Sequence, residues 1–229
     1  LERIVSELSA TPCANLPQAL TSWAELKGGY RFLNNAHVTH AGIIETERQA
    51  TVQRIAQAGG AVVLAVQDST SFNFAHRPAL TGLGVLDDNH TPGFFAHTTL
   101  GVSEQGVPLG VLSQQVWSRA PRAKRARNAH QTLPITEKES FKWIHGLRHV
   151  ATLPHTVITV CDREGDIYEL FQEAQIQHQT FLVRGTKNRR LATAPNLFEQ
   201  LATVAVSATY PLTVRRQPNQ AEREAKIEL

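Results

Sequence analysis

The stretch AVVLAVQD at residues 61–68 decides the fold of this chain, together with its counterpart TVITVCD at residues 156–162. An apolar run of this length is typical of a strand that is buried on both faces of a sheet. The first run ends on Asp68 and the second on Asp162. Because open α/β sheets bind their ligands at the carboxyl ends of the strands, we expect both carboxylates at one sheet edge. If the strands are neighbours, the two carboxylates can hold a divalent metal ion between them.

The composition is that of an ordinary globular chain. Its 229 residues are 41% hydrophobic and 19% charged, which excludes a disordered chain and is enough for one main domain with an accessory piece. The two cysteines exclude a disulfide scaffold and a multi-cysteine zinc site, and they suit a reducing cytoplasm. No apolar run approaches the roughly 20 residues that span a bilayer, so no membrane partner is expected. The chain starts at Leu1, contains no methionine and stops at Leu229, which indicates a piece of a longer protein.

The net charge of +3 at pH 7 permits nucleic-acid binding without arguing for it. The distribution of the cations is more informative, because many of them fall in two clusters. The first cluster contains Arg119, Arg122, Lys124, Arg125 and Arg127, and the second contains Arg184, Lys187, Arg189 and Arg190. Each cluster is either a solvated loop or a surface that contacts phosphates.

Periodicity divides the chain into helices followed by alternating strands and helices. Apolar residues at helical spacing predict helices within residues 1–58, the last of which runs from about Thr39 to Ala58 and ends at Gly59. Strands are then predicted at 61–67 and, as a hairpin, at 97–103 and 107–117.

A capping-box pattern, Thr136 with Glu139 three residues later, predicts the start of the next helix. The strand that ends at Asp162, a helix over residues 166–177 and a short strand over 180–184 follow. The resulting order is that of an α/β chain with a mixed sheet and helices against it.

This order matches a ribonuclease-H-like core, in which the first strand and a later strand lie side by side in the centre of the sheet. We expect a helical N-terminal region at residues 1–58 and the core at residues 59–190. The start of a β-rich insertion is expected at residues 191–229, where the pattern changes to a short helix and exposed strands.

The two aspartates suit phosphodiester chemistry. Cleavage or transfer needs an activated nucleophile and a stabilised leaving oxygen, and two divalent ions about 3.5–4 Å apart supply both. Mg²⁺ and Mn²⁺ prefer oxygen ligands, so Asp68 and Asp162 are candidate catalytic residues and metal ligands. Either aspartate alone would be interpreted as a turn or cap residue, but both strands end in the same way. This shared pattern favours the metal interpretation.

Residues around the two aspartates have candidate supporting roles. The hydroxyls of residues 69–71 can fix the orientation of the Asp68 carboxylate, and Arg163 is placed to meet a phosphate. Asp166 has the pattern of a helix N-cap. Glu164 has two possible interpretations, as a metal ligand or as a surface residue.

Five sequence blocks carry a family resemblance. They are GYRFLNN at 29–35, QDSTS at 67–71, GFFAH at 93–97, EKESFKW at 137–143 and VCDREGDI at 160–167. In this order the blocks resemble the DDE transposases of the bacterial insertion-sequence-four family, over most of residues 20–190. The last two blocks are the most specific.

The resemblance implies a DNA transposase that binds transposon ends and catalyses metal-dependent strand cleavage and strand transfer (cut-and-paste transposition). It implies a ribonuclease-H-like core, a helical DNA-binding region in residues 1–58 and a β-rich insertion. Asp68 and Asp162 then match the first two acids that bind Mg²⁺ or Mn²⁺. The third acid belongs to a Tyr-x-x-Arg-x-x-x-Glu motif, which this sequence does not contain.

The 229-residue chain by itself is therefore expected to be inactive. Glu164 and Glu199 stay open as substitutes for the third acid, although a short amphipathic helix explains Glu199 better. Two alternatives also stay open. One is a truncated, non-catalytic DNA-binding or inhibitory transposase derivative. The other is a stand-alone ribonuclease-H-like nuclease, in which Glu164 or Glu199 would have to face Asp68.

The resemblance further implies double-stranded DNA as the partner, a homodimer on that DNA, and the cytoplasm of a bacterium, at the nucleoid when DNA is bound. The expected phosphate contacts are Arg163, Arg184, Lys187, Arg189 and Arg190. Residues 119–127 are a further candidate for phosphate contacts. Tyr30 and Arg31 are candidates for contacts to the transposon end, although core packing is the first expectation for Tyr30. Core packing is also expected for Trp117 and Trp143.

Overall fold

The computed structural model describes residues 2–121, 133–193, 195–216 and 220–228. Four residues of the first basic cluster, Arg122, Lys124, Arg125 and Arg127, lie outside this part of the chain. By their contacts the residues divide into two compact units, Leu1–Gly185 and Thr186–Leu229. No helix of the described residues is long and apolar enough to cross a membrane.

Three short helices open the first unit: α1 (Glu2–Ala10), α2 (Leu16–Ala19) and α3 (Trp23–Leu33). The side chain of Ser22 caps α3 by accepting a hydrogen bond from the backbone N–H of Glu25, at 3.2 Å. Helix α3 passes close to the end of α2, because a Cβ on Gly29 would lie 2.9 Å from Leu20 Cδ1. The backbone of α3 therefore lies directly against the Leu20 side chain at this position.

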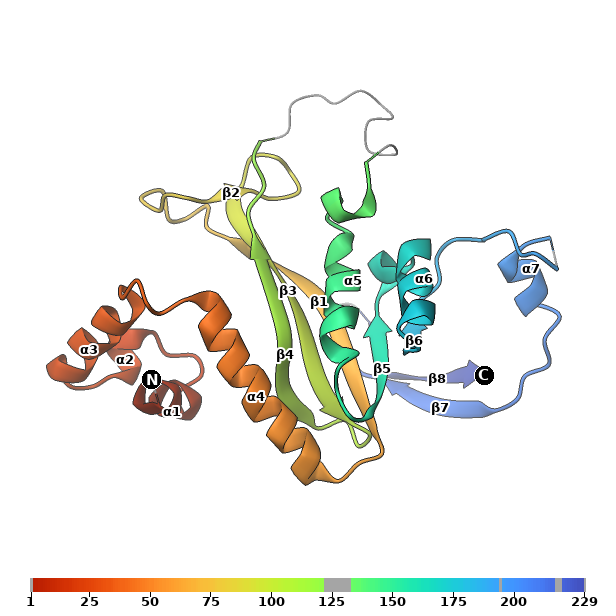
Figure 1. Cartoon of the computed structure of the whole chain (residues 1–229), viewed down its shortest axis with the longest axis horizontal. Coiled ribbons are helices and arrows are strands. Elements are labelled where there is room, and N and C mark those ends of the chain that lie inside the picture. Colours follow the sequence, from red (N-terminus) through yellow and green to blue (C-terminus); the bar gives the residue numbers. More distant parts are fainter. Residues whose placement is uncertain (1, 122–132, 194, 217–219, 229) are drawn as a thin grey trace. The chain divides into compact units, whose positions relative to one another are not determined.

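The long helix α4 (His40–Ala58) has the boundaries that the sequence predicts. Thr39 caps its start by accepting from the N–H of Gly42, and Gly59 ends it in the left-handed conformation with φ of 67°. Figure 1 shows α4 running along β4, against which it packs.

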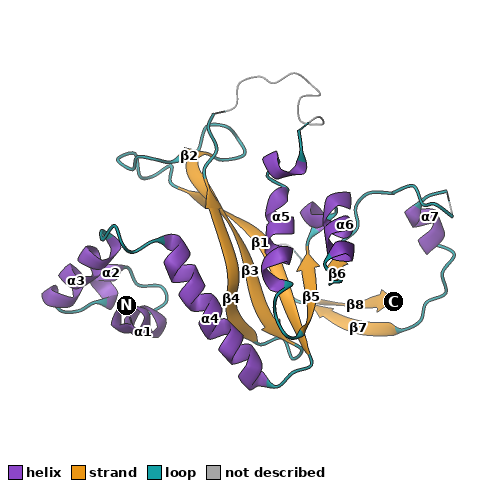
Figure 2. Cartoon of the chain, in the orientation of Figure 1, coloured by secondary structure: helices purple, strands orange, loops and turns teal. Residues whose placement is uncertain are grey.

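The sheet places the strand before Asp68 and the strand before Asp162 side by side at its centre, as the sequence predicts. Its strands are β1 (Val62–Asn73), β2 (Gly84–Val85), β3 (Pro92–Ser103), β4 (Pro108–Trp117), β5 (Thr156–Cys161) and β6 (Thr180–Val183). The order across the sheet is β4-β3-β1-β5-β6, with the short β2 pairing with the start of β3. Strands β1, β5 and β6 are parallel, whereas β3 and β4 are antiparallel to their neighbours. This is the mixed sheet of a ribonuclease-H-like core, in which β1 and β5 are central neighbours (Figure 2).

Two local predictions are wrong. Strand β1 does not end at Asp68 but continues to Asn73, because β3 pairs with it as far as the Asn73–Gly93 position. The capping box at Thr136 does not form either, and α5 (Phe141–Val150) begins after Ser140. The Glu139 carboxylate instead accepts hydrogen bonds from Arg119, so a tertiary contact replaces the local one.

The start of the next helix also differs from the prediction. Helix α6 (Tyr168–Ile176) begins two residues later than expected, with Ile167 at the N-cap position. Asp166 is therefore not the N-cap, and it is buried, with 3% of its surface exposed.

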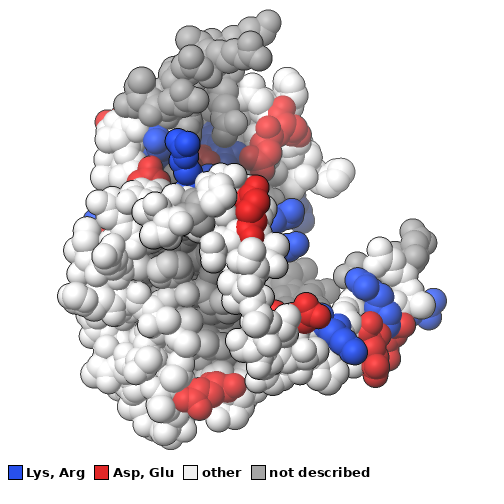
Figure 3. Space-filling model, turned by 90° about the vertical axis from the view of Figure 1, so that its right-hand side faces the viewer, with Lys and Arg blue, Asp and Glu red and all other residues white. Residues whose placement is uncertain are grey.

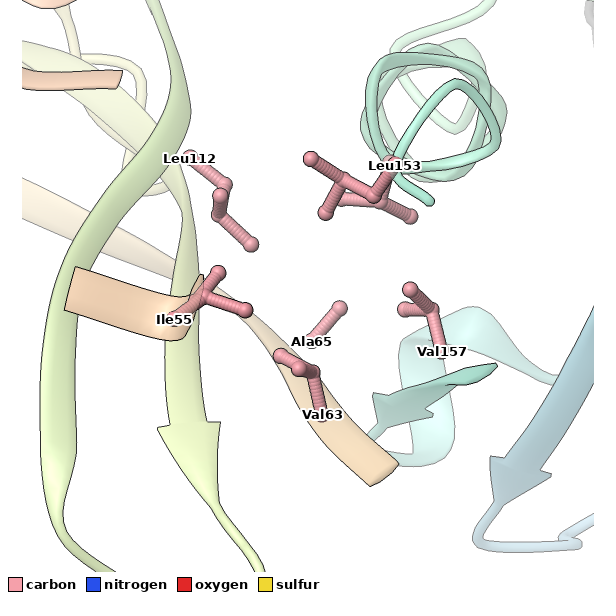
Figure 4. Packing of buried hydrophobic residues seen from close by; sticks show 7 residues of the cluster. Ile55, Val63, Ala65, Leu112, Leu153 and Val157 are labelled. Carbon is pink, nitrogen blue, oxygen red and sulfur yellow. The ribbon is translucent and has the colours of Figure 1, made fainter. Parts of the chain in front are cut away.

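The helices α4, α5 and α6 cover one face of the sheet. Val63 and Ala65 of β1 and Val157 of β5 meet Ile55 of α4 and Leu153 after α5 in one buried cluster, which Figure 4 shows from close by. A second cluster joins α5 and α6 around Trp143, Leu147 and Leu170. The alternate residues of the central strands, Leu64, Val66, Ile158 and Val160, point to the other face and are only half-buried.

The second unit contains α7 (Leu197–Leu201) and a hairpin of β7 (Thr209–Val214) and β8 (Arg223–Glu228). Helix α7 is the short helix expected around Glu199. The Glu199 carboxylate accepts hydrogen bonds from the side chains of Asn188 and Asn196, and its pKa is lowered, first by its own backbone N–H and then by these two amides.

Candidate metal centre and nucleic-acid interface

The two predicted metal ligands occupy neighbouring positions in the sheet. Gln67 of β1 is in register with Cys161, the last residue of β5, so Asp68 of β1 and Asp162, which directly follows β5, come next on two adjacent chain segments. Adjacent strands lie about 4.8 Å apart. The structure therefore brings these aspartates together, while their role as metal ligands stays a prediction.

Arg184 extends this row of residues to the third strand. Cys161 is in register with Val183 of β6, and the backbone N–H of Arg184 donates to the Cys161 carbonyl oxygen at 3.2 Å. Asp68, Asp162 and Arg184 are all exposed. A phosphate contact by Arg184 would thus lie next to the two carboxylates.

Both carboxylates belong to the face of the sheet that α4, α5 and α6 do not cover. Side chains alternate between the two faces of a strand. Gln67 and Cys161 are buried on the helix-covered face, whereas Asp68 and Asp162 directly follow them and are exposed. Burial raises the pKa of the Cys161 thiol to about 12, so this cysteine stays a protonated core residue.

Each carboxylate is oriented by the backbone of the next residues. The N–H of Ser69 donates to Asp68 Oδ1 at 2.7 Å, and the N–H of Glu164 donates to Asp162 Oδ1 at 2.8 Å. The hydroxyl of Ser69 was expected to do this, but it contacts His97 instead. The structure gives no hydrogen bond within its described part to either Oδ2. Two carboxylate oxygens on adjacent strands fit the oxygen preference of Mg²⁺ and Mn²⁺.

Glu164 is directed to α5. Its Oε2 lies 3.0 Å from Lys142 Nζ, and the lysine side chain is largely buried, with an exposed fraction of 10%. Lys142 also lies near the rings of Trp117 and Trp143. Glu164 therefore anchors the loop that follows Asp162. Among the described residues, no three His, Cys, Asp or Glu side chains are grouped closely enough to hold a metal ion.

The basic residues have different surroundings. Arg119 donates to Asp87 and Glu139 and lies over the Phe95 ring at 3.9 Å, so these contacts hold it in the fold instead of leaving it free for phosphates. This corrects the expectation for residue 119. These same hydrogen bonds, that to Glu139 first, raise the pKa of Arg119. Arg163 is exposed directly after Asp162.

Lys187, Arg189 and Arg190 belong to the second unit. In Figure 3 the blue and red atoms of the described residues lie side by side in small groups on the face drawn, and no broad patch has one sign. The role of these three residues in DNA binding stays a prediction.

Helix α3 presents a second candidate surface. Its exposed side includes Trp23, Lys27, Tyr30 and Arg31, with exposed fractions of 76% for Trp23 and 45% for Tyr30. The only acidic residue of this helix, Glu25, is ion-paired with Arg3. Because Tyr30 is exposed, the prediction that it packs in the core was wrong. Aromatic and basic side chains without an acid among them suit contacts to a nucleic-acid backbone.

The tryptophans only partly follow the predictions. Trp143 is in the core, with 1% of its surface exposed. Trp117 is half-buried, stacks on Phe95 and donates from Nε1 to Glu139 at 3.2 Å.

Sequence reasoning missed the polar residues beneath the aspartates. Gln67 and His97 are 2% and 0% exposed and form a hydrogen bond, although both lie in strands that were interpreted by their apolar residues. Gln67 was the available signal, because a glutamine inside a buried apolar run needs a partner.

Residues 1–38 match the protein family described as Transposase DNA-binding. This match covers α1, α2 and α3. Among solved structures, the chain is similar to a Mos1 strand transfer complex at 10% sequence identity and a TM-score of 0.26, with 80% of this chain and 57% of that chain covered. It is also similar to a pre-cleavage Mos1 transpososome at 10% identity and a TM-score of 0.25, with coverages of 78% and 57%. The chain thus spans less than two thirds of the chain in either structure, and the fold assignment above depends on the strand order alone.

Proposed function

We propose that this chain is the end-binding and metal-binding part of a DDE transposase of the insertion-sequence-four family, which cleaves and joins DNA strands. The observation that carries the proposal is the register of β1 and β5, which makes Asp68 and Asp162 neighbours on one exposed face. The match of residues 1–38 to Transposase DNA-binding supports the DNA partner. A homodimer on the DNA, implied by the same resemblance, belongs to this proposal.

In this proposal Asp68 and Asp162 hold Mg²⁺ or Mn²⁺ through their free carboxylate oxygens. When bound, such ions activate a nucleophile and stabilise the leaving oxygen of a phosphodiester. The backbone amides of Ser69 and Glu164 keep the two carboxylates in place. Arg184, next in the row, holds a phosphate of the DNA beside them, and Arg163 contacts the backbone nearby.

We expect Asp68→Asn and Asp162→Asn each to weaken the binding of Mn²⁺ to the chain by about 10-fold or more, because each removes one of two charged oxygen ligands. Titration of the chain with Mn²⁺, followed by electron paramagnetic resonance, measures this. Binding to the wild-type chain should itself be weak, since the described residues contain no group of three His, Cys, Asp or Glu side chains that could hold a metal ion. Asp88→Asn is the matched control, because Asp88 is an exposed aspartate held by Thr91 outside this row.

A cleavage assay separates the alternatives. With Mg²⁺ and duplex DNA the wild-type chain is expected to bind without cutting. Cleavage that disappears in Asp68→Asn would instead favour a stand-alone nuclease with a complete site. Unchanged Mn²⁺ affinity in both aspartate variants would favour a non-catalytic DNA-binding derivative and would overturn the metal site.

We also propose that the exposed side of α3 contacts DNA. The double variant Lys27→Glu, Arg31→Glu should bind duplex DNA more weakly and with a salt dependence reduced by about 2, since each phosphate contact contributes about 0.9 to the slope of log K against log salt. Fluorescence anisotropy of a labelled duplex over a series of salt concentrations measures both quantities.

Arg215→Glu, Arg216→Glu is the matched control for this variant. It changes the net charge equally, at two exposed arginines of the second unit. An equal loss of affinity in both double variants would mean that only net charge matters, and the assignment of α3 would then be wrong.

A further inference from the structure

A layer of buried polar side chains lies directly behind Asp68, on the face of the sheet that the helices cover. Earlier in the same strands this face is apolar, with Val63 and Ala65 in β1. Toward the carboxyl end of β1 it becomes polar, and the buried residues there are Gln67, His97, Thr99 and Ser113. Burying polar groups reduces the stability of the fold unless these groups form hydrogen bonds. A polar layer at this place therefore stabilises the core less than apolar residues would, unless it is fully hydrogen-bonded.

His97 is the centre of this layer. Its side chain is fully buried, and its ring meets that of Trp143 edge-on, with the centroids 4.5 Å apart. Nε2 lies 3.0 Å from Gln67 Oε1, and Nδ1 lies 2.9 Å from Ser69 Oγ. Gln67 is in turn closely covered by α5, because a Cβ on Gly146 would lie 2.4 Å from Gln67 Oε1. Both ring nitrogens of His97 are therefore held by β1.

The partners of His97 define the direction of these hydrogen bonds. The Gln67 amide turns its Oε1 to His97 and leaves its buried Nε2 without a hydrogen-bond partner among the described residues. In this orientation Oε1 accepts, so Nε2 of His97 carries the hydrogen. In a neutral imidazole Nδ1 then accepts, and the Ser69 hydroxyl is the donor. Burial, followed by the nearby Lys142 and His145, lowers the pKa of His97 to about 3, which keeps the ring neutral at ordinary pH.

Ser69 connects this buried layer to the exposed carboxylate. Its hydroxyl points inward to His97, whereas its backbone N–H donates to Asp68 Oδ1 at 2.7 Å. Fixing the side chain of Ser69 restrains the peptide group that carries this N–H. Outer hydrogen bonds of this kind orient ligands and tune metal affinity in other proteins.

We propose that His97 is a positioning residue, which holds the Asp68 carboxylate in one orientation through the hydroxyl and backbone N–H of Ser69. Its effect on metal binding rests on the proposed function, in which Asp68 is a metal ligand. Its effect on the Ser69 amide does not, and this difference allows the two proposals to be tested separately.

The first test measures the amide of residue 69 by NMR in the metal-free chain. In His97→Phe and in Ser69→Ala this amide should exchange with solvent about 10-fold faster than in the wild type, since its restraint is lost. Thr51→Val is the matched control, because Thr51 is an equally buried polar residue of α4 on the same face. A long-range ¹⁵N spectrum should show His97 as the Nε2–H tautomer. The Nδ1–H tautomer would show that the donors and acceptors assigned to Gln67, His97 and Ser69 are wrong.

The second test measures Mn²⁺ affinity in the same variants. His97→Phe and Ser69→Ala should each weaken it by about 10-fold, and the double variant should be no weaker than either single one, because both interrupt the same connection. If both variants keep the wild-type amide exchange and lose only thermal stability, His97 is merely structural and the proposal is wrong. If Asp68→Asn leaves Mn²⁺ affinity unchanged, the proposed function fails, while the amide exchange still decides the role of His97.

Discussion

Lowering the pH from 7 to 4.5 is expected to destabilise this protein by about 2.7 kcal/mol through His97 alone. Burial lowers the pKa of this histidine from 6.5 to about 3, with smaller effects from Lys142 and His145 of α5. Between these two values the unfolded chain binds one proton that the folded chain does not. Stability therefore rises with pH in this window and decreases by about 1.4 kcal/mol for each unit of acidification. Over the whole range from pH 6.5 to about 3, the free energy of unfolding decreases by about 5 kcal/mol through this group.

Urea unfolding of the wild type and of His97→Phe at pH 7 and pH 4.5 measures this effect. Carboxylates also titrate in this range, so the informative quantity is the difference between the two proteins in their change with pH. On acidification the free energy of unfolding of His97→Phe should decrease by about 2.7 kcal/mol less than that of the wild type. His76→Phe, which removes an exposed histidine, should behave like the wild type. Equal pH dependence in all three proteins would show that His97 takes up its proton in the folded state as readily as in the unfolded chain, and the prediction would then be wrong.

Trp143→Ala is expected to reduce the free energy of unfolding by about 3–5 kcal/mol, the usual cost of removing a large aromatic side chain from a core. Trp143 is 1% exposed and joins Ile144, Leu147 and Leu170 in the cluster between α5 and α6. It also covers the His97 ring, so its loss leaves a cavity beside the polar layer. Since a domain of this kind has a stability of about 5–15 kcal/mol, this single change removes a large part of it.

The matched control for this prediction is the same substitution at Trp23, whose side chain is 76% exposed. Trp23→Ala should change the stability by less than about 0.5 kcal/mol. Urea unfolding at pH 7, followed by circular dichroism, compares the two variants. Similar losses in both would mean that Trp143 is not the centre of the packing between α5 and α6.

Most of the fold could be predicted from local sequence. The apolar runs before Asp68 and Asp162 indicated neighbouring strands in the centre of the sheet, and the short glycine-containing connection at residues 104–106 indicated the hairpin of β3 and β4. Helix α4 was marked at both ends by Thr39 and Gly59. These features depend on the periodicity, turns and caps of short segments, which form through local interactions and need no residue that is distant in the chain.

Two predictions from local sequence were wrong because residues that are distant in the chain form stronger contacts. The Thr136–Glu139 capping box did not form, because the Glu139 carboxylate pairs with Arg119, which follows β4. Strand β1 passes beyond its apolar run, because β3 continues to supply hydrogen-bonding partners. In both places a tertiary contact outweighs a local preference of about 1 kcal/mol.

By itself the sequence determined the order of strands and helices along the chain and the presence of an aspartate after each of two apolar runs, because both follow from the side-chain pattern along the chain. The tertiary structure alone decided that Asp68, Asp162 and Arg184 form one row and that Glu164 turns to Lys142. It also decided that Ser69 turns its hydroxyl to His97 and only its amide to Asp68. The physical reason is that register and hydrogen-bond partners are selected by packing between residues far apart in the chain, which no local pattern encodes.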